Sequence, residues 1–230
     1  NEIGFISKKY NLWLHVDAAW AGTALLLPEM RYMIQGIENV DSLVFNPHKW
    51  MFTNFDCSAY FVKDKGALIQ TFEILPEYLK TREGNTVNNY RDWGIQLGRR
   101  FRALKLWFVI RTFGVKGLQD KIRNHVNWAK AFESWINNHP QFELLAPSPL
   151  ATVCFRFHPT GIDDESTLND LNVKLLEDIN QSDKIFLTHT KLNEKFSIRF
   201  VVGQTNTELR HIQEAWAIIL AKAEYLLHQF

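Results

Sequence analysis

The chain has 230 residues, of which 46% are hydrophobic and 22% charged, a composition typical of a globular protein with one or two domains. Its formal net charge of +1 gives no reason to expect nucleic acid or a membrane surface as a partner, and no apolar run approaches the ~20 residues of a membrane span. Two cysteines, Cys57 and Cys154, make no disulfide framework, which favours a cytoplasmic protein.

The first part of the chain alternates short apolar runs with polar connections, as α/β domains do. Residues 1–11 keep a helical spacing, and residues 12–16 predict a short buried strand that ends at Asp17. An acid at the carboxyl end of a buried parallel strand lies where α/β sheets bind ligands, although aspartate is also a common helix N-cap. Residues 41–45 and 58–62 predict two further strands of the same sheet.

A proline ends the second strand. Pro47 has no amide hydrogen and disfavours helix in the residue before it, so the sheet ladder is expected to end near Asn46. His48 and Lys49 then lie just past a strand end. A lysine there is either a surface residue that snorkels out of a core or a desolvated amine ready to form a Schiff base. Because Asp17 and Lys49 each follow a strand, both can line one crevice.

The next stretch is more polar. Pro28 predicts a turn or a helix start and residues 63–66 predict a polar turn. Residues 69–92 predict a long functional or disordered loop. It contains Tyr78, which either packs its ring at the base of the loop or acts in the chemistry. Four arginines follow: Arg91, Arg99, Arg100 and Arg102. They fit an anion site or structural ion pairs, and we favour ion pairs for most of them.

The remainder predicts a smaller α+β domain. A helix from Leu97 is expected to stop at Gly114, a plausible C-cap, and a second helix spans residues 115–139. The second helix carries an apolar stripe: Leu118, Ile122, Val126, Ala129, Phe132 and Ile136. Further predictions are strands over 142–145 and 152–157, a helix over 165–179, paired strands over 185–188 and 196–202, and a final helix behind a capping box at 205–208. We expect a structural ion pair at Arg199.

Several motifs in this chain resemble one enzyme family. They are His-Val-Asp-Ala-Ala-Trp at 15–20, Asn-Pro-His-Lys-Trp at 46–50, Leu-Gly-Arg-Arg-Phe-Arg at 97–102, and further matches over 54–59, 106–108 and 114–118. Their type and order resemble the pyridoxal 5'-phosphate (PLP)-dependent group II aromatic-L-amino-acid decarboxylases. The resemblance implies an α/β fold: the C-terminal part of an aspartate-aminotransferase-type (fold type I) PLP-binding large domain over residues 1–104, and a small α+β C-terminal domain over 105–230.

The resemblance also implies roles for individual residues. Lys49 would carry the PLP cofactor through a Schiff base, for which desolvation supplies a free amine. Asp17 would pair with the protonated pyridine nitrogen and keep the ring an electron sink. Ala19 would pack on one face of the ring, and Asn46 and His48 would assist the phosphate or the lysine linkage. No metal site is predicted.

Substrate handling is implied in the same way. Tyr78 matches the family's catalytic tyrosine on a mobile lid, and its phenol, with a pKa near ~10, can protonate the substrate carbon at neutral pH. Leu97 and Gly98 would line the substrate pocket, where a glycine leaves room for a bulky ring. The expected reaction turns an aromatic L-amino acid, namely DOPA, tyrosine, tryptophan or 5-hydroxytryptophan, into its amine and carbon dioxide.

Other functions remain open on the same residues. They are an aldehyde synthase that combines decarboxylation with oxidative deamination, another group II amino-acid decarboxylase, and a non-catalytic domain that keeps the fold. The family's polypeptide is about twice as long as this chain. We therefore expect the N-terminal half, with the stacking histidine and the phosphate loop, to be a necessary partner, joined covalently or as a separate chain. The complete enzyme is expected to be a homodimer.

Overall fold

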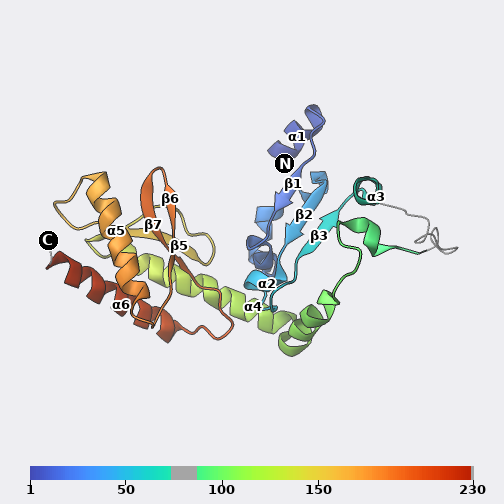
Figure 1. Ribbon diagram of the computed structural model, residues 1–230. Coiled ribbons are helices and arrows are strands. Elements are labelled where there is room, and N and C mark those ends of the chain that lie inside the picture. Colours follow the sequence, from blue (N-terminus) through green and yellow to red (C-terminus); the bar gives the residue numbers. More distant parts are fainter. Residues whose placement is uncertain (74–86, 229–230) are drawn as a thin grey trace. The chain divides into compact units, whose positions relative to one another are not determined.

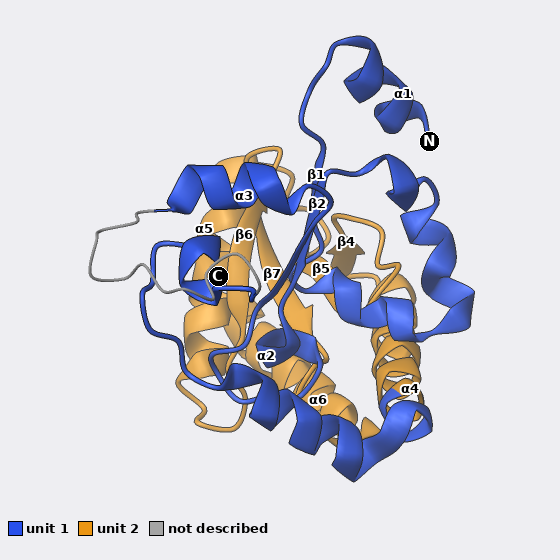
Figure 2. Cartoon of the chain, turned by 90° about the vertical axis from the view of Figure 1, so that its right-hand side faces the viewer, with its two compact units in different colours: residues 1–118 blue, residues 119–230 orange. Residues whose placement is uncertain are grey.

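A computed structural model describes residues 1–73 and 87–228, so Tyr78 lies outside the described residues. The chain forms two compact units, Asn1–Leu118 and Gln119–Phe230, which Figure 2 shows in different colours. The boundary predicted between residues 104 and 105 lies in the helix α4 (Arg102–Asn137), as does the limit between the units. Over the described ranges, no helix combines the length and the apolar character that a bilayer crossing requires.

The first unit is built on a three-stranded sheet in the order β1 (His15–Asp17), β2 (Ser42–Phe45) and β3 (Ala59–Val62) (Figure 1). β1 runs parallel to β2, and β3 runs antiparallel to it. The strands predicted over 41–45 and 58–62 are thus confirmed, and β2 ends one residue before Asn46 as the proline required. The prediction of a buried strand from residue 12 is wrong, because β1 is an edge strand and the side chains of Leu12 and Trp13 are 58% and 54% exposed.

Helices and short 3₁₀ turns connect these strands. They are α1 (Glu2–Lys9), η1 (Ala21–Leu26), η2 (Pro28–Ile34), η3 (Ile37–Asn39), α2 (Pro47–Trp50), α3 (Lys65–Phe72) and η5 (Tyr90–Trp93). The first helix and the helix start at Pro28 agree with the predictions. The turn predicted at 63–66 is instead the start of α3, where the Asp64 carboxylate accepts the Gly66 N–H at 2.8 Å and caps the helix.

The helix α4 contains a break at Gly114, whose φ of 62° and ψ of 173° interrupt the helical backbone. This is a conformation that glycine adopts at low cost and other residues avoid. The predicted interruption at this residue is therefore confirmed. The helix starts at Arg102 rather than at Leu97.

The second unit packs helices against a four-stranded antiparallel sheet in the order β4, β5, β7, β6. Its elements after α4 are β4 (Phe142–Leu144), β5 (Thr152–Phe157), α5 (Glu165–Asn180), β6 (Thr188–Leu192), β7 (Lys195–Val201) and α6 (Leu209–Leu227). All six residues of the predicted apolar stripe on α4 are buried. Phe132, at the centre of that stripe, lies 4.0 Å from the ring of Phe200 and 5.6 Å from that of Trp216, centroid to centroid.

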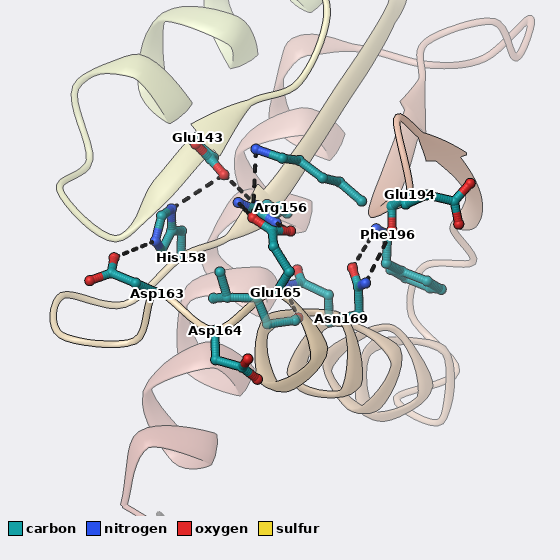
Figure 3. Close-up of polar contacts among 12 residues, drawn as sticks. Glu143, Arg156, His158, Asp163, Asp164, Glu165, Asn169, Glu194 and Phe196 are labelled. Atoms are coloured by element: carbon teal, nitrogen blue, oxygen red, sulfur yellow. Dashed lines mark hydrogen bonds and ion pairs between the residues drawn. The ribbon is translucent and has the colours of Figure 1, made fainter.

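Side-chain bonds from α5 explain one error in the strand prediction. β6 starts at Thr188 rather than at 185, because the Asn180 amide bonds both the N–H (2.8 Å) and the carbonyl (3.1 Å) of Leu187. In the middle of α5, Asn172 bonds the N–H and carbonyl of Phe157. Nearer its start, Asn169 accepts the N–H of Phe196 (Figure 3). Such bonds satisfy strand backbone where the ladder stops.

The buried ion pair of this unit is not the predicted one. Arg199 makes no ion pair with any described residue, so the expected pair is not found in this part of the chain. Arg156, only 1% exposed, instead contacts Glu143 through Nε and Glu165 through both terminal nitrogens, at 2.7 and 3.1 Å (Figure 3). The capping box of α6 also differs from the prediction, since it pairs Glu208 with His211.

Candidate functional site

The carboxyl ends of the parallel strands β1 and β2 lie side by side. Asp17, the last residue of β1, is in register with Val44 of β2. Two hydrogen bonds extend the pairing past the strand ends: Ala18 N–H donates to Val44 O, and Asn46 N–H donates to Ala19 O, both at 2.9 Å. The loop that follows Asp17 is thereby fixed against the segment that leads to Lys49, at the edge where α/β sheets bind ligands.

The Asp17 side chain is exposed and held by its own loop. Its Oδ1 accepts the Ala19 N–H at 2.9 Å, and within the described part of the chain the carboxylate has no ion-pair partner. The alternative that Asp17 caps a helix is not supported, because the N-cap of the following helix η1 is Trp20. The carboxylate is therefore oriented by the backbone and keeps an oxygen available for a ligand.

Lys49 lies in the short helix α2, whose first residue is Pro47. Its backbone N–H donates to Asn46 O at 2.9 Å, and its side chain is exposed. Among residues 1–73 and 87–228, its amine has no hydrogen-bond or ion-pair partner. Over the described residues the amine is thus exposed to solvent, and a drier environment would require further protein around it.

His48 and Asn46 are fixed by the segment that leads into β3. The backbone N–H of Cys57 lies 2.9 Å from His48 Nδ1. The Cys57 carbonyl lies 2.7 Å from the same ring nitrogen and also accepts the backbone N–H of His48 at 3.2 Å. Both backbone groups of Cys57 thus orient the His48 ring through Nδ1, and among the described residues Nε2 has no hydrogen-bond partner. Asn46 Oδ1 accepts the Ser58 hydroxyl at 2.6 Å.

Two tryptophans that the sequence reasoning passed over join the two halves of this site. Trp20, three residues after Asp17, stacks on Trp50, which follows Lys49; the ring centroids are 4.1 Å apart and the rings are inclined by 1°. Trp50 is fully buried. In the sequence, the only sign of this contact was that Trp20 and Trp50 lie in the two motifs that contain Asp17 and Lys49.

Arginines near this region form ion pairs around Asp56. Arg102 Nε and Nη2 lie 3.0 and 2.9 Å from Asp56 Oδ2, and Arg100 and Lys105 lie 3.8 Å from Oδ1. The hydrogen bond from Arg102 holds the pKa of Asp56 below its ordinary value of 3.8. With the pair of Arg91 and its neighbour Asp92, the predicted structural role is confirmed for three of the four arginines.

The residues predicted for the substrate pocket are not joined to the strand ends. Leu97 and Gly98 are exposed, and a Cβ added at Gly98 would meet no atom within 4 Å. No hydrogen bond, ion pair or ring contact between described residues links them to Asp17 or Lys49. The structure therefore brings together Asp17, Ala19, Asn46, His48 and Lys49, and leaves Leu97 and Gly98 apart from that group.

Comparison with known proteins identifies relatives of the whole chain. The sequence profile described as "Pyridoxal-dependent decarboxylase conserved domain" matches residues 1–158. Tyrosine decarboxylase 4 of Petroselinum crispum is 45% identical, over 97% of this chain and 45% of that protein. Phenylacetaldehyde synthase of Arabidopsis thaliana is also 45% identical, over 99% of this chain and 46% of that protein. The chain thus spans about half the length of these curated relatives.

A solved structure has the same fold. The crystal structure of Oryza sativa TDC with PLP and tryptamine matches with a TM-score of 0.92 and 37% identity, over 97% of this chain and 47% of that one. The predicted fold class is confirmed by this likeness: an α/β, fold-type-I large-domain part together with a small α+β domain.

Proposed function

Because this chain belongs to the pyridoxal-dependent decarboxylase family, we propose that the enzyme containing it converts an aromatic L-amino acid into its amine and carbon dioxide. The observation that carries the proposal is the sheet edge at which Asp17 ends β1 and the neighbouring parallel strand β2 leads into α2, which carries Lys49. Both side chains are exposed and neither forms an ion pair with a described residue, so an amine and a carboxylate are available to one ligand.

The residues at this edge fit PLP. The cofactor requires a lysine for covalent attachment and an acid for its ring nitrogen, roles for Lys49 and Asp17. Small side chains at Ala18 and Ala19 leave space for a flat ring, and His48 can donate to an anionic oxygen through Nε2 in the tautomer that carries a hydrogen there. When bound, PLP supplies the electron sink that makes loss of the carboxyl group possible.

The remaining roles in the reaction are proposed for side chains of this chain. Asp17, as a carboxylate, favours the protonated form of a nearby ring nitrogen. Lys49 needs the neutral form of its amine to attach the cofactor, and burial by further protein would favour that form. Tyr78, outside the described residues, is the proposed donor of a proton to the substrate Cα after carbon dioxide leaves.

An aromatic substrate is supported by the relatives and by Gly98. The named activities of the relatives concern tyrosine and phenylacetaldehyde, and tryptamine is the amine bound in the Oryza sativa structure. A glycine at position 98 leaves room for an aromatic ring because it has no side chain, and Leu97 is its proposed neighbour in the pocket. Both residues are exposed in the described chain, so further protein would have to close the pocket around them. DOPA, tyrosine, tryptophan and 5-hydroxytryptophan are the candidates.

An aldehyde synthase is the second candidate, and the match to phenylacetaldehyde synthase favours it. Such an enzyme consumes molecular oxygen and water, and it releases an aldehyde, carbon dioxide, ammonia and hydrogen peroxide in place of the amine and carbon dioxide. Tyr78 argues for the decarboxylase, because one route to the aldehyde synthases replaces the lid tyrosine. Assaying amine against aldehyde and peroxide from the same substrate separates the two activities.

The rest of the polypeptide is the proposed partner that completes the site. β1 is an edge strand, and exposed apolar side chains flank it, among them Phe5, Leu12 and Trp13. Extensive exposed apolar surface is typical of an interface. We propose a homodimer of the complete enzyme, with residues 1–104 in its large domain and 105–230 in its small domain. The two free cysteines favour the cytoplasm.

Borohydride reduction of the complete enzyme tests the attachment. We expect a pyridoxyl adduct on the peptide that contains Lys49, and its loss in Lys49→Arg, which keeps the charge but forms no Schiff base. Lys63→Arg is the matched control, because Lys63 is an exposed lysine whose amine bonds Glu38 O. An enzyme without an adduct on the Lys49 peptide would leave only a non-catalytic domain. A separate 230-residue chain that forms the adduct alone would refute the need for the partner half.

A further inference from the structure

The distance between the carboxylate of Asp17 and the amine of Lys49 is not set by their own side chains. Both are exposed, and the part of the chain that the structure describes offers neither of them an ion pair. Asp17 bonds only the N–H of its own loop. Whatever fixes the two groups relative to each other must act through the segments that carry them.

Two features join these segments. The first is the pair of backbone hydrogen bonds, from Ala18 to Val44 and from Asn46 to Ala19. The second is the stack of Trp20 on Trp50, with centroids 4.1 Å apart and an angle of 1° between the rings. The backbone bonds hold the strand ends, whereas the stack joins the residues farther along, beyond Asp17 on one side and next to Lys49 on the other.

The stack leaves little freedom on one side. Trp50 is fully buried, so its ring cannot rotate away without opening the core of the unit. Trp20 is half-buried and rests flat on it. Two rings in face-to-face contact cannot approach each other further. The stack therefore sets a minimum separation between the loop after β1 and the helix α2.

This separation matters for a rigid ligand. A single pyridine ring that is attached to Lys49 and faces Asp17 with its nitrogen cannot stretch to follow a displaced partner. A displacement of about 1 Å in such a geometry can cost around a hundredfold in activity. We propose, on the basis of the proposed function, that Trp20 and Trp50 are a positioning pair that sets the spacing between Asp17 and Lys49 for PLP.

The complete enzyme with Trp20→Leu tests this role. Apoenzyme is titrated with PLP to obtain the dissociation constant and the position of the visible absorbance band, and its melting temperature is measured without PLP. We expect the dissociation constant to rise at least tenfold and the band to shift. Trp20→Tyr, which keeps a flat ring, should have a dissociation constant for PLP within about threefold of the wild-type value. The expected changes follow from the loss of positioning.

Trp128→Leu is the matched control, since Trp128 is also a half-buried tryptophan that packs beside a ring, His125 at 5.7 Å, but lies in the other unit. It should lower the apoenzyme melting temperature while leaving PLP affinity unchanged. If Trp20→Leu does not fold, Trp20→Met, which also removes the flat ring, takes its place, with the same expected tenfold rise in the dissociation constant.

Two results would overturn the positioning role. One is a Trp20→Leu enzyme with the affinity and band of the wild type. The other is a loss of affinity that Trp128→Leu reproduces at the same melting temperature, because that would be general destabilisation. A wild-type enzyme that forms no adduct at Lys49 is a different result: it defeats the proposed function itself, and the positioning role with it.

Discussion

Replacing Arg156 by methionine is expected to destabilise the second unit. The guanidinium is 1% exposed and bonds two carboxylates, one of them through a two-pronged contact with Glu165. Methionine fills much of the same space but removes the positive charge. Glu143 and Glu165 then lose their common partner, and their negative charges repel each other.

The structure sets the size of this effect. Breaking a buried ion pair from one side costs about 3–5 kcal/mol when the remaining charge stays buried. Here the side chains of Glu143 and Glu165 are 34% and 50% exposed, so both can regain water. The expected cost therefore lies near the lower end, about 3 kcal/mol. Arg156→Lys, which keeps the charge but cannot contact both carboxylates in the same way, should cost less.

Hydrogen exchange followed by mass spectrometry measures the loss of stability caused by Arg156→Met, segment by segment, in the complete enzyme. A loss of about 3 kcal/mol corresponds to roughly a hundredfold faster exchange of amides that open with the unit. The increase is expected in β5 and α5, and peptides of β1 and β2 serve as the internal reference. Exchange in β5 and α5 within threefold of the wild type would refute the conclusion that this network stabilises the unit.

Three further predictions concern other positions. Gly114→Ala should cost about 1–3 kcal/mol in thermal unfolding, from backbone strain alone, since an added Cβ meets no atom within 4 Å; an unchanged melting temperature would contradict the left-handed conformation. Phe132→Ala, at a fully buried ring, should cost about 3–5 kcal/mol, whereas a loss below 1 kcal/mol in urea unfolding would mean that the core closes around the gap. The pKa of Asp56 is lowered by Arg102, so the stability from this pair is present above pH 3.8 and is lost as pH falls through the lower folded value; a carboxyl NMR titration should show the midpoint rise in Arg102→Met.

Sequence patterns that span a few residues correctly predicted three features of the fold. The apolar residues on α4 recur at helical spacing, which places them on one face of the helix, and that face packs against the core. The break at Gly114 follows from the backbone freedom of a single residue. The strand end near Asn46 follows from the missing amide of Pro47. None of these requires knowledge of a distant partner.

The errors arise where a distant side chain decides the outcome. Residues 185–188 have the apolar character of a strand, but Asn180 binds the backbone of Leu187 and β6 starts only after it. Similarly, both Arg156 and Arg199 lie on strands of the second unit, and only the three-dimensional arrangement brings Glu143 and Glu165 to Arg156. The stack of Trp20 on Trp50 joins residues thirty positions apart in the same way.

The two kinds of charged group in this chain point to different purposes. Arg156 is buried and bonded on several sides, as a charge must be if the protein is to remain folded. Asp17 and Lys49 are exposed at a rigid sheet edge and form no ion pair with any described residue. Exposed charges without a described partner stay available to a ligand that offers a matching base and carbonyl group, which is what the proposed cofactor site requires.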